Sequence, residues 1–294
     1  MRYSDSDVII RVENLVFSYN KVRVLDGLTF EINRGEFVGL VGPNGSGKTT
    51  LLKCLSKVYT PQEGSIQLDG LDLRKISHLD GAKIYAVVPA EFSMDTNLSI
   101  IETVLLGRYP HLEGVWWEKS RDEEIALDAM ERFNVLHFGN RKLGELSSGE
   151  KQRVLIAKAI AQEARVLLID EPVAHLDLGY QMEIMEMLKG LTEDGVTILA
   201  AMHDLNLAVK YCDKLIVLNK GKIIACGKPE EIVTQKLIED IYGVKTIIQN
   251  IPEVGLVIIP LSTLNNGDVF DKKNGEKRTI EPSKTKSRWR SVEA

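Results

Sequence analysis

Residues 37–50 read FVGLVGPNGSGKTT, an uninterrupted apolar run followed by a glycine-rich turn. The run is typical of a strand that is covered on both faces, and residues 51–58 beyond the turn have helical spacing. The turn fits the pattern G-x-x-x-x-G-K-[ST], in which glycines let backbone N–H groups point inward and the next helix N-terminus faces the same anion. The stretch therefore predicts a strand, a phosphate-binding loop and a helix.

The loop also carries the side chains that nucleotide chemistry needs. Lys48 is expected to reach the β- and γ-phosphates of a nucleotide, and the Thr49 hydroxyl is expected to ligate Mg²⁺. The candidate binding residues of the loop are Gly42, Pro43, Asn44, Gly45, Ser46, Gly47, Lys48, Thr49 and Thr50.

A second run, VLLIDE at 166–171, places two acidic residues at the end of a buried strand. Burying a carboxylate is costly unless it meets a cation, so Asp170 is expected to hold Mg²⁺ directly or through water. Glu171 would then point toward an attacking water, as a general base or an orienting group. The alternative, an acid pair that only caps a turn, fits less well downstream of a phosphate loop.

Strand and helix patterns alternate along the chain, which predicts an α/β fold. The strand patterns outside the loop region lie at 8–19, 22–32, 166–170 and 198–202. Residues 214–226 predict two short strands around an Asn-Lys-Gly turn, and Pro229 is expected to open a single helix that runs to Gly243.

Residues 92–160 contain no buried-strand run and predict a helical subdomain inserted into the α/β core. Ser120 and Glu123 have the spacing of a capping box ahead of the helix Ile125–Phe133. This spacing predicts a helix N-cap at Ser120.

LSSGEKQR at 146–153 predicts one more helix N-terminus that can face an anion. The segment lies between the phosphate loop and VLLIDE, and this order of motifs points to a family. Over residues 8–245 the chain resembles the nucleotide-binding subunit of ATP-binding cassette (ABC) transporters. The LSGGQ signature of that family corresponds to 146–150, with a serine in place of one glycine and a glutamate in place of the glutamine. The resemblance implies that Ser147, Ser148, Gly149 and Glu150 cover the ATP bound by a second copy.

Three further residues take roles from the same resemblance. Asp177, in HLD, corresponds to the D-loop and would lie at a subunit contact. His203, after ILAAM, corresponds to the switch histidine that contacts the γ-phosphate, and Tyr19 corresponds to the aromatic residue that stacks on adenine. Catalysis is then expected from Glu171 and His203 together with Lys48.

The resemblance implies an ABC ATPase fold with an antiparallel β subdomain and a helical subdomain. It also implies ATP and Mg²⁺ as ligands, a homodimer across two ATP sites, and integral membrane permease subunits as partners, with a solute-binding protein reached through the permease. The expected domain is 8–245, followed by an extension at 246–270 and a basic, disordered tail at 271–294. Localisation is expected at the inner face of the cell membrane, on the cytoplasmic side.

One departure from the family pattern concerns the glutamine expected after the strand that leads into the helical subdomain. The segment reads VVPAE, so Ala90 holds that position and Glu91 follows. The missing amide would be an outer contact to Mg²⁺ and the lytic water, and water can fill such a gap because Mg²⁺ retains several waters. Nucleotide binding is therefore expected to persist, with weaker hydrolysis.

The segment LLGRYPH at 105–111 resembles the subgroup that energises uptake of ferric siderophores, haem and cobalamin. That resemblance implies an ATPase subunit of an importer for such a cargo. Two alternatives stay open: a soluble ABC ATPase in iron–sulfur assembly or nucleic-acid maintenance, and a nucleotide-gated module that hardly hydrolyses.

Composition and cysteine spacing exclude disulfide scaffolds, zinc modules and integral membrane proteins. The 294 residues are 44% hydrophobic and 27% charged, as in soluble globular proteins. The three cysteines have no CxxC or zinc-site spacing, and no run approaches the ~20 apolar residues of a spanning helix. Residues 272–290 carry eight Lys/Arg and two Glu, a net charge of +6. Because the net charge of the whole chain is -5, the remaining residues carry -11. Such a basic tail can meet nucleic acid or anionic lipid, or stay solvated.

Overall fold

The computed structural model describes residues 7–90, 97–112 and 119–264. A mostly parallel, six-stranded sheet lies at its centre, in the order β10-β9-β3-β8-β7-β6. Only the edge strand β10 runs antiparallel to its neighbour. The strands are β3 (Phe37–Val41), β6 (Tyr85–Val88), β7 (Val166–Asp170), β8 (Thr197–Ala201), β9 (Lys214–Asn219) and β10 (Lys222–Gly227).

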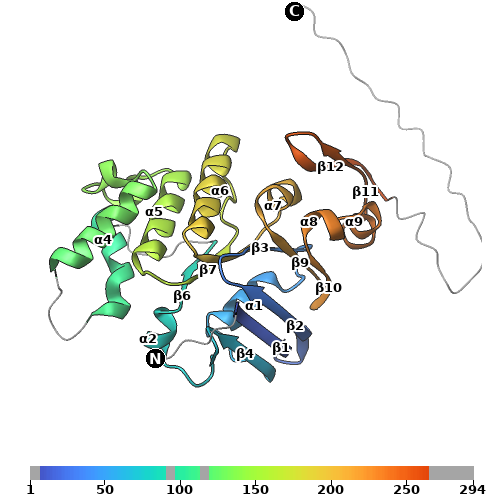
Figure 1. Cartoon of the computed structure of the whole chain (residues 1–294), viewed down its shortest axis with the longest axis horizontal. Coiled ribbons are helices and arrows are strands. Elements are labelled where there is room, and N and C mark those ends of the chain that lie inside the picture. The colour runs from blue at the N-terminus through green and yellow to red at the C-terminus, as the bar shows by residue number, and fades with distance from the viewer. Residues whose placement is uncertain (1–6, 91–96, 113–118, 265–294) are drawn as a thin grey trace, which may run out of the picture.

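A second, antiparallel sheet has the order β2-β1-β4-β5 and lies below the central sheet in Figure 1. Its strands are β1 (Val8–Tyr19), β2 (Val22–Asn33), β4 (Glu63–Leu68) and β5 (Leu71–Asp72). The helix α1 (Lys48–Leu55) packs between the two sheets in one hydrophobic core with them.

Helices cover the other face of the central sheet and form a second hydrophobic core. The two cores divide each central strand, because alternate residues face opposite sides: Leu167 and Ile169 belong to one core and Val166 and Leu168 to the other. The helices described beyond α1 are α2 (His78–Ala82), α3 (Ile100–Leu105), η1 (Leu106–His111), α4 (Lys119–Arg132), η2 (Leu136–Phe138), η3 (Leu143–Glu145), α5 (Ser148–Ala161), α6 (Leu178–Glu193), α7 (Leu205–Tyr211), α8 (Pro229–Ile232) and α9 (Gln235–Tyr242).

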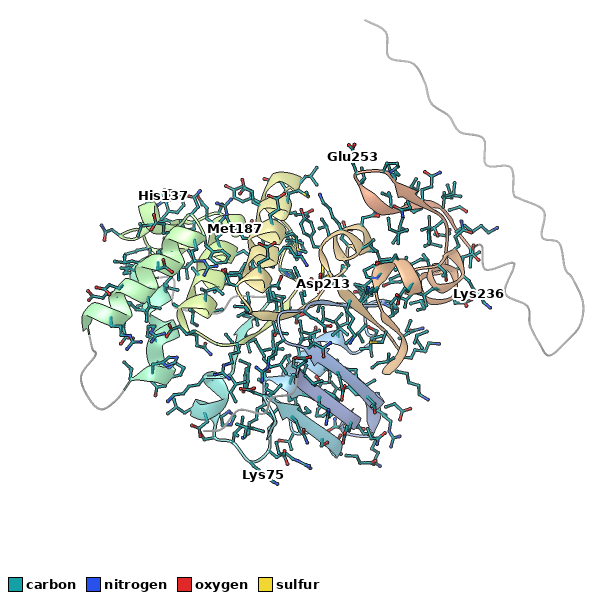
Figure 2. The ribbon with its side chains drawn as sticks, viewed as in Figure 1. Lys75, His137, Met187, Asp213, Lys236 and Glu253 are labelled. Carbon is teal, nitrogen blue, oxygen red and sulfur yellow. The ribbon has the colours of Figure 1, made fainter. Side chains whose placement is uncertain are left out.

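The helical region around α4 and α5 and the C-terminal hairpin lie at opposite ends of the molecule (Figure 1). The hairpin consists of β11 (Val244–Ile251) and β12 (Gly255–Thr263). Figure 2 shows His137 of η2 at one of these ends and Lys236 of α9, the helix that packs against β11, at the other. No helix in the described ranges is long and apolar enough to span a membrane.

The α/β fold and the strands predicted around the phosphate loop are confirmed, but two helix boundaries were wrong. Residues 229–243 form two helices, because Val233 is extended and Thr234 caps α9 by accepting a hydrogen bond from the Leu237 N–H. Ser120, predicted as a helix N-cap, lies inside α4, which already includes Lys119. Capping boxes are formed by Ser99 with Glu102 and by Ser147 with Glu150.

Candidate functional site

The loop 42–50 turns sharply between β3 and α1. Gly42, Gly45 and Gly47 have φ values of +150°, +76° and +109°, which L side chains rarely adopt. A Cβ on Gly42 would lie 2.0 Å from the Leu218 carbonyl oxygen of β9, so the loop backbone rests directly on the neighbouring strand. The glycines therefore let the chain form a close concave turn at the N-terminus of α1.

Lys48 lies inside this turn with only 6% of its surface exposed. Its ammonium group donates to the carbonyl oxygens of Gly42, at 2.7 Å, and Pro43, at 3.3 Å. Burial lowers its pKa, and the charges of Glu171 and Asp170 act in the opposite direction. Within the described residues, the hydrogen bonds of this buried cation go to backbone carbonyl oxygens. An anion such as phosphate would supply the charge partner that a buried cation requires.

Thr49 and Asp170 come from different elements and meet beside Lys48. The Thr49 hydroxyl, on α1, donates to Asp170 Oδ1, at the end of β7, over 3.4 Å. Burial raises the pKa of Asp170, because a carboxylate at this position is partly removed from water. The Thr49 hydroxyl and the Asp170 carboxylate are hard oxygen ligands beside the candidate phosphate-binding loop. They fit Mg²⁺, which needs few protein ligands.

The raised pKa of Asp170 predicts that this side chain affects the stability of the fold in a pH-dependent way. Because its pKa is raised in the folded state, the carboxylate destabilises the protein above that pKa, and this cost vanishes as the pH falls below the unfolded value. We expect Asp170→Asn to raise the melting temperature by a few degrees at about pH 8 and to lose this advantage near pH 4. Thermal melts across this pH range measure it. Asp128→Asn, an exposed carboxylate on α4, should show no such pattern; an equal gain there would contradict the prediction.

Glu171 and His203 form a close pair at the same edge of the sheet. The Nε2 of His203 and the Oε1 of Glu171 are 2.6 Å apart. The two residues follow β7 and β8, which run parallel with Asp170 opposite Ala201, so the strand ends bring the side chains together. Glu171 has a φ of +53° and donates its N–H to the Ala201 carbonyl over 3.0 Å.

Tyr19 lies at the end of β1, near the start of α1. Its hydroxyl is 3.4 Å from Thr50 Oγ1, and its ring meets the rings of Phe17 and Tyr59 edge-on at 5.0 and 5.5 Å. The side chain is 41% exposed. A ring held by two aromatic neighbours and still open to solvent is suited to stacking on a base.

The signature segment, residues 146–150, forms the N-terminus of α5. Ser147 accepts from the Glu150 N–H, and the Glu150 carboxylate accepts from the N–H and hydroxyl of Ser147 at 2.8 and 2.7 Å. These hydrogen bonds lower the pKa of Glu150. A capping box accepts Glu or Gln at this position, which explains locally why glutamate can replace the family glutamine.

Asp177 caps α6 by accepting from the Tyr180 N–H over 3.0 Å. Among the residues that the structure describes, no hydrogen bond or ion pair joins Asp177 or the signature segment to the loop 42–50. The structure thus brings the loop, Asp170, Glu171, His203 and Tyr19 to one site and leaves the signature segment and Asp177 on separate helices.

Comparison with known proteins settles the family. The model of the ABC transporter family matches residues 25–174, half of the chain. The chain belongs to the ABC transporter family. It is 38% identical over 260 residues to the ferric enterobactin transport ATP-binding protein FepC of Escherichia coli K12, covering 88% of this chain and 96% of FepC. The protein is therefore an ABC transporter ATPase.

Two solved structures extend the comparison. An inward-facing transporter assigned to the metal-chelate type aligns with a TM-score of 0.77 and 29% identity, over 87% of this chain and 98% of that one. The ATP-binding cassette MJ0796, solved as a dimer after hydrolysis with ADP and Pi, aligns with a TM-score of 0.68 and 28% identity, over 75% and 99% of the two chains.

Tyr180 is a residue of this ABC ATPase that the sequence analysis missed. Tyr180 carries the signature segment, because a Cβ on Gly149 would lie 2.9 Å from its ring and Arg153 covers the ring at 4.8 Å; its position three residues after Asp177 was the only signal in the sequence. Ala90 is exposed just after β6, and Glu91 lies outside the described residues, as does the basic tail 271–294.

Proposed function

We propose that this protein is an ATP-hydrolysing subunit that dimerises on ATP and powers a membrane permease from the inner face of the cell membrane. The observation that carries the hydrolytic role is the Glu171–His203 pair, 2.6 Å apart, at the sheet edge that also holds Lys48 and Asp170. Phosphoryl transfer requires positioning and electrostatic stabilisation more than covalent chemistry from the protein, and this cluster offers both.

Each side chain has a role that follows from its position. Lys48 binds the β- and γ-phosphates, and Thr49 with Asp170 holds Mg²⁺, which when bound would neutralise phosphate charge. Glu171 orients the attacking water and accepts its proton. His203 holds the Glu171 carboxylate through their hydrogen bond and faces the γ-phosphate.

The site is proposed to be completed by a second copy of the chain. The signature segment and Asp177 are on helices that make no hydrogen bond to the loop 42–50, yet the N-terminus of α5 is suited to an anion. Two copies arranged head to tail would let Ser147, Ser148 and Gly149 of one copy cover the γ-phosphate held by the other. The dimeric structure of the cassette MJ0796 with ADP and Pi supports the assembly of two copies.

The cargo class is proposed from similarity. FepC is named for ferric enterobactin transport, and the inward-facing relative is of the metal-chelate type. Together with the segment 105–111, these likenesses support uptake of a ferric siderophore, haem or cobalamin. Deleting the gene should abolish cellular uptake of radiolabelled iron chelate, haem or cobalamin; normal uptake of all three would contradict the cargo class.

Hydrolysis by the purified chain tests the proposal, and Ala90 sharpens the test. We expect Mg²⁺-dependent turnover that rises several-fold in Ala90→Gln, because the amide would add an outer contact to Mg²⁺ and the lytic water. Steady-state ATP hydrolysis measures both. Lys83→Gln, which adds a glutamine at another exposed position near β6, is the matched control and should leave turnover unchanged.

Three outcomes separate the alternatives. Turnover in the unchanged chain supports the motor. Turnover that appears only in Ala90→Gln would favour a nucleotide-gated module with weak hydrolysis, the second candidate, which the missing glutamine motivates. Equal turnover in all three proteins would show that position 90 takes no part in catalysis.

A further inference from the structure

The segment Gly107–His111 rests on the C-terminal end of α5. A Cβ on Gly107 would lie 2.2 Å from the Lys158 carbonyl oxygen, so a residue with any side chain would push η1 away from the helix. Pro110 of η1 is buried as well. Glycine at position 107 therefore permits backbone-to-helix contact between η1 and α5.

Arg108 is fixed at this contact with 4% of its surface exposed. Its guanidinium donates to Asp122 Oδ1 on α4 at 2.8 Å, to the Ala161 carbonyl oxygen at 2.6 Å and to Glu163 Oε2 at 2.8 Å. Ala161 is the last residue of α5, so the cation satisfies a helix-terminal carbonyl and lies at the negative end of the helix dipole. One side chain thus joins α4, η1 and α5.

His111 and Gln162 extend the contact to the central sheet. The Nε2 of His111 is 2.8 Å from the Gln162 carbonyl oxygen. The Gln162 side chain donates in turn to the carbonyl oxygens of Tyr85, at 2.9 Å, and Ala82. Tyr85 opens β6, the strand that leads to Ala90, so the end of α5 is tied to the sheet as well as to η1.

The opposite end of α5 carries the signature segment. At 1.5 Å per residue its 14 residues span about 21 Å. A tilt of about 10° at the clamped end would shift the signature end by about 3.7 Å over that length. Misplacement of reacting groups by about 1 Å can cost a hundredfold in rate, so the position of this helix end matters for catalysis.

We infer that Gly107, Arg108, His111, Asp122 and Gln162, termed the α5 clamp, set the position of the signature segment against the nucleotide held by a second copy. Arg108 and His111 are positioning residues, because they act through α5 and lie at the helix end away from Ser147. The inference rests on the proposed two-copy ATP site. It gives the segment 105–111 a role within that site that is independent of the cargo.

The test compares the affinity of the monomer for nucleotide with the ATP-driven dimerisation of two copies. His111→Ala removes the donor to Gln162, and His111→Gln restores one. In a Glu171→Gln background, we expect ATP-driven dimerisation of His111→Ala to need about tenfold more protein, with the affinity of the monomer for a fluorescent ATP analogue unchanged. Turnover without the Glu171 change should fall by a similar factor at unchanged KM, and His111→Gln should recover most of both. Light scattering, fluorescence titration and steady-state kinetics supply the readouts.

Arg108→Gln should show the same split with a larger loss, of ten- to a hundredfold in turnover. Arg132→Gln is its control, because it breaks the exposed Arg132–Asp194 pair and leaves α5 untouched.

Clamp variants that melt earlier but dimerise and turn over normally below their melting temperature would show a purely structural role and overturn the inference. If Glu171→Gln alone fails to dimerise with ATP, the two-copy site fails and the clamp with it; normal dimerisation of that reference and of all clamp variants overturns the clamp alone.

Discussion

Replacing Glu171 with glutamine is expected to lower the ATPase turnover number by about 10²–10⁴-fold, the usual contribution of a general base. Glutamine keeps the size of the side chain and can still meet His203 across the 2.6 Å contact, but its amide cannot accept a proton from water. ATP binding should persist, because Lys48 and the loop 42–50 are unchanged. The ATP-bound dimer should therefore accumulate.

Steady-state hydrolysis and ATP titration measure the two halves of this prediction. Glu186→Gln, which removes an exposed carboxylate on α6, is the matched control and should retain wild-type turnover. If the turnover of Glu171→Gln were within twofold of the wild type, another residue would have to be the general base. Loss of ATP binding together with turnover would instead give Glu171 a role in binding.

Gly42→Ala is expected to weaken ATP binding by about tenfold to a hundredfold, because an overpacking strain of about 1–3 kcal/mol falls on the loop that holds the nucleotide. The new Cβ would lie 2.0 Å from the Leu218 carbonyl oxygen, and a backbone atom of a central strand cannot move aside easily. The loop must shift instead, which displaces the Gly42 carbonyl that Lys48 contacts at 2.7 Å. Overpacking of this kind should also lower the free energy of unfolding by about 1–3 kcal/mol.

Gly195→Ala separates the clash from the cost of backbone strain. Gly195 also has a positive φ, +88°, but a Cβ there would have no neighbour within 4 Å, and the residue follows α6 away from the loop. That variant should lose about 1–2 kcal/mol from the left-handed backbone alone and bind ATP normally. Isothermal titration and chemical denaturation of both variants supply the comparison, and equal ATP affinity in the two would contradict the predicted clash.

Several parts of the fold could be predicted from sequence because their causes are local. FVGLV and VLLI (166–169) are apolar without interruption, and all of β3 is buried, as a strand covered on both faces requires. The split between α8 and α9 could not be seen in the same way. Its cause is a single cap at Thr234 within a stretch whose apolar spacing is helical throughout.

The sequence by itself determined the phosphate loop, the strand-end acids and the family, because each is written in adjacent residues whose chemistry needs no partner far along the chain. Only the tertiary structure decided that His203 meets Glu171, since parallel pairing of β7 and β8 sets that contact. It likewise decided that Arg108 holds the end of α5, a contact between residues 53 positions apart. Such contacts depend on how elements pack, and packing is not encoded at any one position of the chain.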